Sequence, residues 1–246
     1  MVAVSLTSIP SRYPYLERMV ESLSRLDPGP STIYVVLPLS NLKGQARAPL
    51  DPQFRQSLER FATILEPEVD HGPVCRYTDP KVSGWLLGCD DDEIYTQTWF
   101  NAFCEVAQHA FADGDSLVFT GRTNRLQSLQ RKTVLGYSGV MIHTRARDML
   151  RASLPWKRYA QLVDDNMISD LLNKHNYQIV SLDLPRTEIF AARASRSGTL
   201  DGEGLVNGRT KSLIRFYGRR RWHSFVVALV AVCLVIITVT WSARNR

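Results

Sequence analysis

Cysteine is scarce in this chain, and the common nucleotide-binding signatures are missing. The four cysteines, at Cys75, Cys89, Cys104 and Cys233, show no CxxC spacing and no paired framework, which argues against a disulfide scaffold and suits a reducing compartment. No GxGxxG, no Walker-type loop and no Ser/His/Asp order stands out.

Acidic residues are absent after Glu203, so the net charge of +6 is unevenly distributed along the chain. Eight of the 30 basic residues lie beyond that point, which leaves 22 basic and 24 acidic residues, a charge of −2, for the rest of the chain. The globular part is thus not basic, and we expect no nucleic-acid partner. The basic run 219–221 is better placed to meet anionic lipid headgroups.

The longest apolar stretch, residues 224–241, contains no charge, no glycine and no proline. As a helix it would cover roughly 27 Å, close to the hydrocarbon core of a bilayer. A buried core helix is the alternative, although little sequence follows it to complete a core. Most nearby basic residues precede the stretch, namely Arg209, Lys211, Arg215, Arg219, Arg220 and Arg221, and Arg244 and Arg246 follow it. With no secretory signal at the start, we expect a single-pass C-terminal membrane anchor and a cytosolic globular part.

Upstream of this stretch, short apolar runs alternate with amphipathic segments, as in a parallel α/β sheet. Strands are predicted at 2–6, 33–37, 62–65, 84–89, 117–120, 137–143 and 177–182, and helices at 16–26, 56–61, 98–112, 145–151 and 165–174. Prolines break the polar region 41–53, which predicts a surface loop. The predicted organisation is one domain at 1–197, a Gly-containing then basic linker at 198–223, a transmembrane helix at 224–241 and a short tail at 242–246.

Three consecutive aspartates, Asp90, Asp91 and Asp92, follow the apolar strand predicted at 84–89. They should stand at the carboxyl end of that strand, where open α/β sheets bind ligands. Mg²⁺ or Mn²⁺ prefers oxygen ligands and shares its coordination shell with substrate phosphates. The triplet is therefore a candidate metal site, with an acidic turn that caps the next helix as the alternative.

A second acidic pair, Asp164 and Asp165, stands at the start of a predicted helix. Helix capping explains such a pair, but either carboxylate could also take a proton from an acceptor hydroxyl or stabilise positive charge on a sugar. Asp70 and Arg76 flank a tight Gly-Pro turn, which could aim a cation at a diphosphate.

In order along the chain, these motifs resemble a group of small GT-A-like glycosyltransferases found in large DNA viruses of algae, in algae and in bacteria. Thr7-Ser8-Ile9-Pro10-Ser11-Arg12 resembles the family's TTIPSR opening. The pattern DxGPxxK is met by Asp70, Gly72, Pro73 and Arg76, with arginine in place of the family's lysine. DDDxxY, GxxG and the late DD are met by Asp90, Asp91, Asp92, Tyr95, Gly136, Gly139, Asp164 and Asp165. The segment 77–83 departs from the pattern, because it is short and contains proline where the resemblance implies a small apolar helix.

The resemblance implies a GT-A-type nucleotide-sugar-binding domain with a mostly parallel central sheet and a site divided among these motifs. Its donor-binding residues would be Thr7, Ser8, Arg12, Asp70, Arg76, Asp90 and Asp91. A Mn²⁺ or Mg²⁺ cofactor would be held by Asp92 and Asp90, and the catalytic carboxylates would be Asp164 and Asp165.

The leading hypothesis is therefore a metal-dependent glycosyltransferase that moves a sugar from a nucleotide sugar, with a UDP-sugar expected, to a hydroxyl of a glycan, lipid or protein. Two alternatives stay open. One is a non-catalytic, membrane-anchored binding module of the same fold, and the other is a metal-dependent phosphoesterase.

Overall fold

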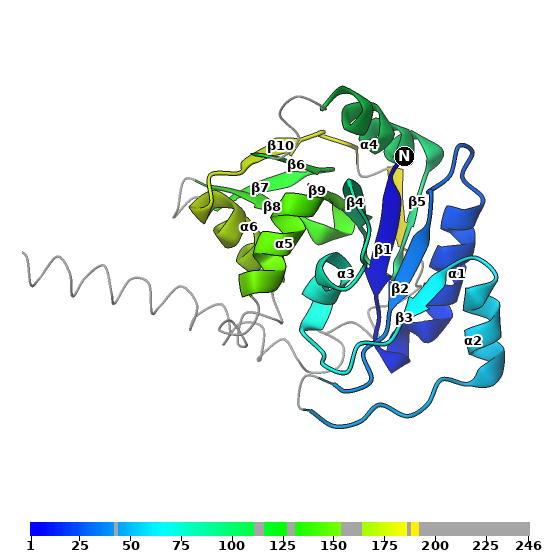
Figure 1. Ribbon diagram of the computed structural model, residues 1–246. Coiled ribbons are helices and arrows are strands. Elements are labelled where there is room, and N and C mark those ends of the chain that lie inside the picture. The colour runs from blue at the N-terminus through cyan, green and yellow to red at the C-terminus, as the bar shows by residue number, and fades with distance from the viewer. Residues whose placement is uncertain (42–43, 111–115, 127–130, 154–163, 186–187, 192–246) are drawn as a thin grey trace, which may run out of the picture.

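The computed structural model describes residues 1–41, 44–110, 116–126, 131–153, 164–185 and 188–191, and these form an α/β domain around a seven-stranded sheet (Figure 1). The strands lie in the order β10-β6-β9-β4-β1-β2-β3. Their bounds are β1 Ala3–Thr7, β2 Ile33–Val36, β3 Thr63–Leu65, β4 Trp85–Gly88, β6 Leu117–Thr120, β9 Val140–His143 and β10 Gln178–Ser181.

The sheet is mostly parallel, as predicted, and one strand runs against the others. Strand β1 pairs in parallel with β2 and β4, β2 with β3, and β6 with β10. Strand β9 lies between β4 and β6 and is antiparallel to both. The start of β9 is therefore next to the end of β4.

Alternating strand residues feed two hydrophobic clusters, one on each face of the sheet. In β9, Met141 joins one cluster, while Val140 and Ile142 join the other; Phe119 and Val118 of β6 divide in the same way. Figure 1 shows α1 and α2 together on one side of the sheet and α3, α5 and α6 on the other. The helices are α1 Tyr13–Ser24, α2 Pro52–Glu59, α3 Cys75–Thr78, α4 Gln97–His109, α5 Thr144–Ser153 and α6 Asp164–Lys174.

Most predicted helices are confirmed. The helix expected at 56–61 instead begins at Pro52, so the last two residues of the loop predicted for 41–53 are helical. The side chain of Asp51 caps helix α2 by accepting hydrogen bonds from the backbone N–H groups of Gln53 and Phe54, each at 3.0 Å. Pro52 occupies the first turn, where a missing N–H costs nothing. The proline therefore starts a helix.

The strand expected at 137–143 is also shorter than predicted. It begins at Val140, because residues Gly136–Ser138 form a 3₁₀ turn. Two further 3₁₀ turns, Pro10–Arg12 and Gly72–Val74, lead into α1 and α3. The segment 77–83, where a small apolar helix was expected, holds only the last residues of α3.

Two small antiparallel sheets lie in segments for which no strand was predicted. Strand β5, Glu93–Tyr95, pairs with β11, Ile189–Ala191. Strands β7, Thr123–Leu126, and β8, Arg131–Val134, form the second pair. Strand β5 follows the aspartate triplet directly, so the chain is held on both sides of these residues.

The predicted membrane segment 224–241, the linker 198–223 and the tail 242–246 lie outside the residues that the structure describes. Within the described ranges, no helix combines the length and the apolar character needed to cross a bilayer.

Arg147 of α5 ties this helix to the segment that enters the central strand β4. Its side chain is 1% exposed, and its guanidinium donates hydrogen bonds to the backbone oxygens of Pro80 at 3.1 Å, Val82, and Gly84 at 3.4 Å. One side chain thus satisfies three backbone acceptors of a proline-containing loop.

We expect Arg147→Met to lower the free energy of unfolding by about 3 kcal/mol, because these carbonyls lose a charged donor. Arg145→Met is the matched control, since Arg145 is exposed on the same helix. It should change stability by less than about 0.5 kcal/mol. Urea denaturation measures both, and equal losses for the two variants would contradict the anchoring role.

Candidate functional site

The strand directions bring three of the predicted motifs to one edge of the sheet. Strands β1 and β4 are parallel and adjacent, with Ser5 paired to Gly88, so Ser8 and Asp90 both follow strand ends at this edge. Strand β9 starts at the same edge, because Val140 pairs with Gly88 in antiparallel register. The turn Gly136–Ser138, just before β9, therefore lies beside the aspartate triplet.

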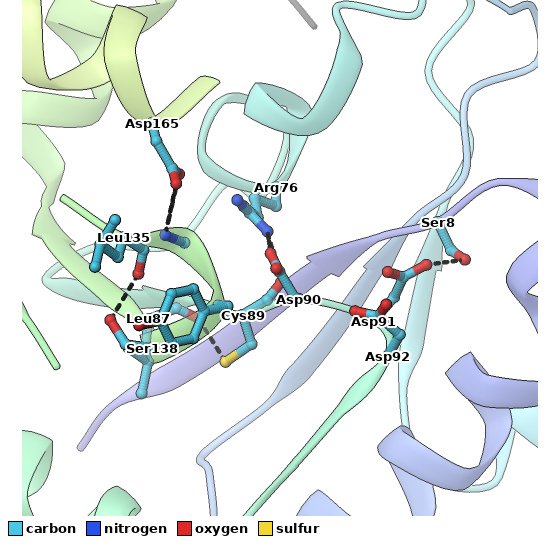
Figure 2. Close-up of polar contacts among 12 residues, drawn as sticks. Ser8, Arg76, Leu87, Cys89, Asp90, Asp91, Asp92, Leu135, Ser138 and Asp165 are labelled. Carbon is cyan, nitrogen blue, oxygen red and sulfur yellow. Dashed lines mark hydrogen bonds and ion pairs between the residues drawn. The ribbon is translucent and has the colours of Figure 1, made fainter. Parts of the chain in front are cut away.

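Asp91 and Asp92 face the opening motif of the chain. Arg12 Nη1 lies 2.5 Å from Asp91 Oδ1, and Arg12 Nη2 lies 3.3 Å from Asp92 Oδ2. The hydroxyl of Ser8 donates a hydrogen bond to Asp91 Oδ2 (Figure 2). Asp91 is 1% exposed and Asp92 is 3% exposed. The turn expected to hold the donor thus also neutralises two buried carboxylates.

Burial raises the pKa of Asp91 to about 6; Asp92 and Asp90 push it in the same direction, and Arg12 and Ser8 oppose them. Burial lowers the pKa of Arg12, but the three carboxylates outweigh burial, so the net shift is upward. Arg12 therefore stays charged and is the electrostatic partner of this part of the triplet.

Asp90 points to a different partner. Its carboxylate Oδ1 lies 2.6 Å from Nη1 of Arg76, which also donates to the backbone oxygen of Cys89 at 2.9 Å. Figure 2 shows Asp90 turned toward Arg76 and Asp91 turned toward Ser8. The side chain of Asp90 is 31% exposed, against 3% for Arg76. Asp90 is thus the most accessible carboxylate of the three.

Gly136 marks the point where Arg76, Asp90 and Asp165 converge. The backbone N–H of Gly136 donates to both carboxylate oxygens of Asp165, each at 3.0 Å (Figure 2). A Cβ atom at position 136 would lie 2.7 Å from Arg76 Nη2, 2.7 Å from Asp165 Oδ1 and 3.4 Å from Asp90 Oδ1. We call these four residues the Gly136 cradle. Because only glycine leaves room there, two carboxylates and a guanidinium surround one small space.

Among the other predicted site residues, Thr7 and Asp70 each have a backbone hydrogen-bond partner outside the cradle. Thr7 donates its hydroxyl hydrogen to the backbone oxygen of Val36 at 2.8 Å. Asp70 accepts a 2.6 Å hydrogen bond from the N–H of Gly72, whose φ of 76° fits only glycine comfortably. Asp164 is the first residue of α6, and its side chain lies outside the described part. Thr7 thus joins the end of β1 to β2, and Asp70 shapes the turn at Gly72.

The DDDxxY pattern includes Tyr95 but gives it no role, and no pattern marks Trp99; both are buried aromatic residues. Tyr95 hydrogen-bonds both Asp90 and the turn Gly136–Ser138, and Trp99 hydrogen-bonds Ser138. Buried aromatic residues with polar tips are common in cores, so composition alone could not distinguish these two.

The charges suit a cation that is bound largely by its substrate. Within the described residues, no group of three or more His, Cys, Asp or Glu side chains is arranged to hold a metal ion. Mg²⁺ and Mn²⁺ often need only one or two carboxylates, with water and phosphate oxygens as the other ligands. Asp90, whose side chain is 31% exposed, fits such a set as one accessible carboxylate, whereas Asp92 is buried beside Arg12.

The sequence matches no protein-family model and none of the curated proteins. Among solved structures, the chain resembles the mannosyltransferase PcManGT from Pyrobaculum calidifontis, solved in complex with GDP-Man and Mn²⁺, with a TM-score of 0.57 and 12% identity. That match covers 89% of this chain and 63% of the mannosyltransferase, so the chain spans less than two thirds of that protein.

Weaker likenesses include the galactosyltransferase LgtC, in complex with donor and acceptor sugar analogs, with a TM-score of 0.46 and 12% identity over 74% of this chain and 73% of that one. Another is a 4-diphosphocytidyl-2C-methyl-D-erythritol synthase, with a TM-score of 0.47 and 9% identity over 80% and 94% of the two chains. The chain therefore shares the α/β fold of the mannosyltransferase.

Arg12→Gln should lower the free energy of unfolding by about 3–5 kcal/mol, because it leaves two buried carboxylates without their cation. Arg25→Gln is the control. Arg25 pairs with Glu21 at 2.5 Å, but these side chains are 73% and 44% exposed, so a loss below about 1 kcal/mol is expected. Chemical denaturation at pH 7.5 compares the variants, and a small loss for Arg12→Gln would show that Arg12 does not stabilise the triplet.

Proposed function

We propose that this chain is a metal-dependent glycosyltransferase that transfers a sugar from a nucleotide sugar to a hydroxyl of a glycan, lipid or protein. The observation that carries the proposal is the Gly136 cradle, where Arg76, Asp90 and Asp165 meet at the carboxyl edge of the sheet. The shared fold with a mannosyltransferase that was solved with GDP-Man and Mn²⁺ supports it. Fold alone does not imply function, so the proposal depends on this site.

The nucleotide would bind along the turn that follows β1. Ser8, Arg12 and Asp91 form a preorganised polar group there, with Arg12 still charged. The resemblance to small GT-A-like enzymes assigns this turn to the base and ribose. A UDP-sugar is the expected donor, and GDP-mannose is the second candidate because the mannosyltransferase carries that ligand.

The diphosphate would lie between the triplet and Arg76. A Mn²⁺ or Mg²⁺ ion held by Asp90 and Asp92 would neutralise negative charge on the leaving diphosphate. Arg76 replaces the lysine of the family pattern, and its planar guanidinium can donate to phosphate while it holds Asp90. Arg76 would thus support an anionic leaving group.

Asp165 would act on the other side of the cradle. Its two oxygens each accept from the N–H of Gly136, which fixes the orientation of the carboxylate in the cradle. In the transfer step, the acceptor oxygen bonds to the anomeric carbon and the bond from that carbon to the diphosphate breaks. The hydroxyl proton passes to a carboxylate, for which Asp165 and Asp164 are the candidates.

The predicted segment 224–241 would keep the domain at a membrane, with the basic residues before it on the cytosolic side. This arrangement would place the site near membrane-borne acceptors.

The direct test is calorimetric titration of the full chain in detergent with UDP, GDP and their sugar conjugates, with Mn²⁺ and with chelator. We expect metal-dependent binding of one nucleoside diphosphate, followed by sugar transfer in acceptor screens. Asp92→Ala should abolish that binding. Asp165→Asn and Asp164→Asn should leave affinity within about threefold and reduce turnover at least tenfold.

Asp148→Ala is the control for these variants, because Asp148 is an exposed residue of α5 that pairs with Arg151. It should bind and turn over normally. A folded protein without nucleotide binding would favour the non-catalytic module. Hydrolysis of the nucleotide without an acceptor requirement would favour the phosphoesterase.

Gly136→Ala tests the cradle itself. The added Cβ would press on Arg76 and Asp165 at 2.7 Å, so we expect at least tenfold weaker nucleotide-sugar binding. Gly29→Ala is a steric match, since its Cβ would lie 2.7 Å from the backbone oxygen of Leu26, at the opposite edge of the sheet. Both variants should lose some thermal stability. Equal affinities of the two variants for the nucleotide sugar would show that the Gly136 cradle is not part of the binding site.

A further inference from the structure

We propose that Tyr95 is a positioning residue for metal-dependent donor binding, and that its hydroxyl holds Asp90 in register with the turn Gly136–Ser138. This inference rests on the proposed function, because it concerns how the same site binds its cation. Tyr95 does not touch the reacting groups and acts through Asp90.

The hydroxyl of Tyr95 joins two segments that come from different parts of the chain. The backbone N–H of Asp90 donates a hydrogen bond to Tyr95 Oη at 3.2 Å. The same hydroxyl donates to the backbone oxygen of Tyr137 at 3.0 Å. A hydroxyl can accept one bond and donate the other, which a phenyl ring cannot do.

The ring of Tyr95 is held firmly enough to act as a fixed support. Tyr95 is 2% exposed, and its ring stacks on Trp99 with centroids 4.0 Å apart and an interplanar angle of 27°. Trp99 is fully buried and donates its Nε1 hydrogen to the backbone oxygen of Ser138 at 2.8 Å. The two aromatic residues therefore contact the turn at successive carbonyls, those of Tyr137 and Ser138.

Gly139 lets the turn lie this close to the aromatic pair. Its φ is 87°, and a Cβ there would lie 2.6 Å from the indole ring of Trp99. The requirement for glycine is thus both conformational and steric. Gly136 belongs to the same turn and binds Asp165 through its N–H. Asp90, the turn and Asp165 are consequently linked through Tyr95.

This linkage matters for a cation because Asp90 is the accessible carboxylate of the triplet. A shift of the Asp90 backbone would change the distance from its carboxylate to Arg76 and to the Gly136 cradle. Loss of the Tyr95 hydroxyl should therefore lower the affinity for the cation while the chain still folds, because the stacked ring remains.

The test is Tyr95→Phe in the full chain purified in detergent, with Tyr34→Phe as the control. Tyr34 lies in the middle of β2, away from the strand ends that form the site. Free Mn²⁺ is measured by electron paramagnetic resonance while Mn²⁺ is titrated in the presence of saturating UDP or GDP, whichever the unmodified chain binds. After subtraction of the Mn²⁺ that the nucleotide alone binds, this readout gives the affinity and the number of sites separately.

We expect Tyr95→Phe to raise the Mn²⁺ dissociation constant about tenfold with one site per chain retained, and Tyr34→Phe to leave it unchanged. A purely structural role would lower the number of sites and leave the affinity of the remaining sites unchanged, which would overturn the proposal. A Mn²⁺ titration of Tyr95→Phe that equals that of the unmodified chain would also overturn the proposal.

Trp99→Phe gives an independent reading, because it keeps the Tyr95 hydroxyl but removes the indole donor to Ser138. The Mn²⁺ dissociation constant should rise in the same direction by about two- to threefold. An unmodified chain that binds neither nucleotide with Mn²⁺ would overturn the proposed function, and this inference with it. If the unmodified chain binds nucleotide with Mn²⁺ and the Tyr95→Phe and Trp99→Phe variants bind Mn²⁺ with the same affinity, only this inference is overturned.

Discussion

Three carboxylates in succession at the end of a central strand repel one another, and two of them are almost completely buried. Two arginines offset this repulsion. Arg12, from the turn before α1, pairs with Asp91 and Asp92, and Arg76, from α3, pairs with Asp90. Each arginine belongs to a different segment of the chain, so the neutralisation of charge also fixes where α1 and α3 lie against the sheet. Two cations against three carboxylates leave an anionic group, which favours a cation carried in by a ligand.

The three aspartates are consequently not equivalent, although the sequence presents them as a run. Asp91 is enclosed by Ser8 and Arg12, and its raised pKa reflects the cost of burial that these partners only partly offset. The side chain of Asp90 is partly exposed and shares the Gly136 cradle with Asp165. Within one triplet, burial thus separates the aspartate that pairs with the turn after β1 from the more accessible Asp90.

Local patterns predicted the strands and helices that lead into the site, because buried strands and amphipathic helices leave a clear period in the sequence. They also placed the triplet at a strand end. The reversed direction of β9 leaves no such local mark, and it is this direction that brings Gly136 beside Asp90. A loop was wrongly predicted at Pro52, because proline can either start or break a helix. The capping contacts of Asp51 show that it starts one. The site residues could be named from the family resemblance, but their pairing required the fold.

A site of this kind gains from being assembled before its ligand arrives, because charged groups that are already aligned pay no reorganisation cost when charge develops. The contacts around the cradle fit that principle. Asp165 is fixed by the N–H of Gly136, and Asp90 is fixed by Arg76 through its carboxylate and by Tyr95 through its backbone. The glycines at 136 and 139 then have one physical explanation: each removes a side chain where rigid, already partnered groups must approach the backbone closely.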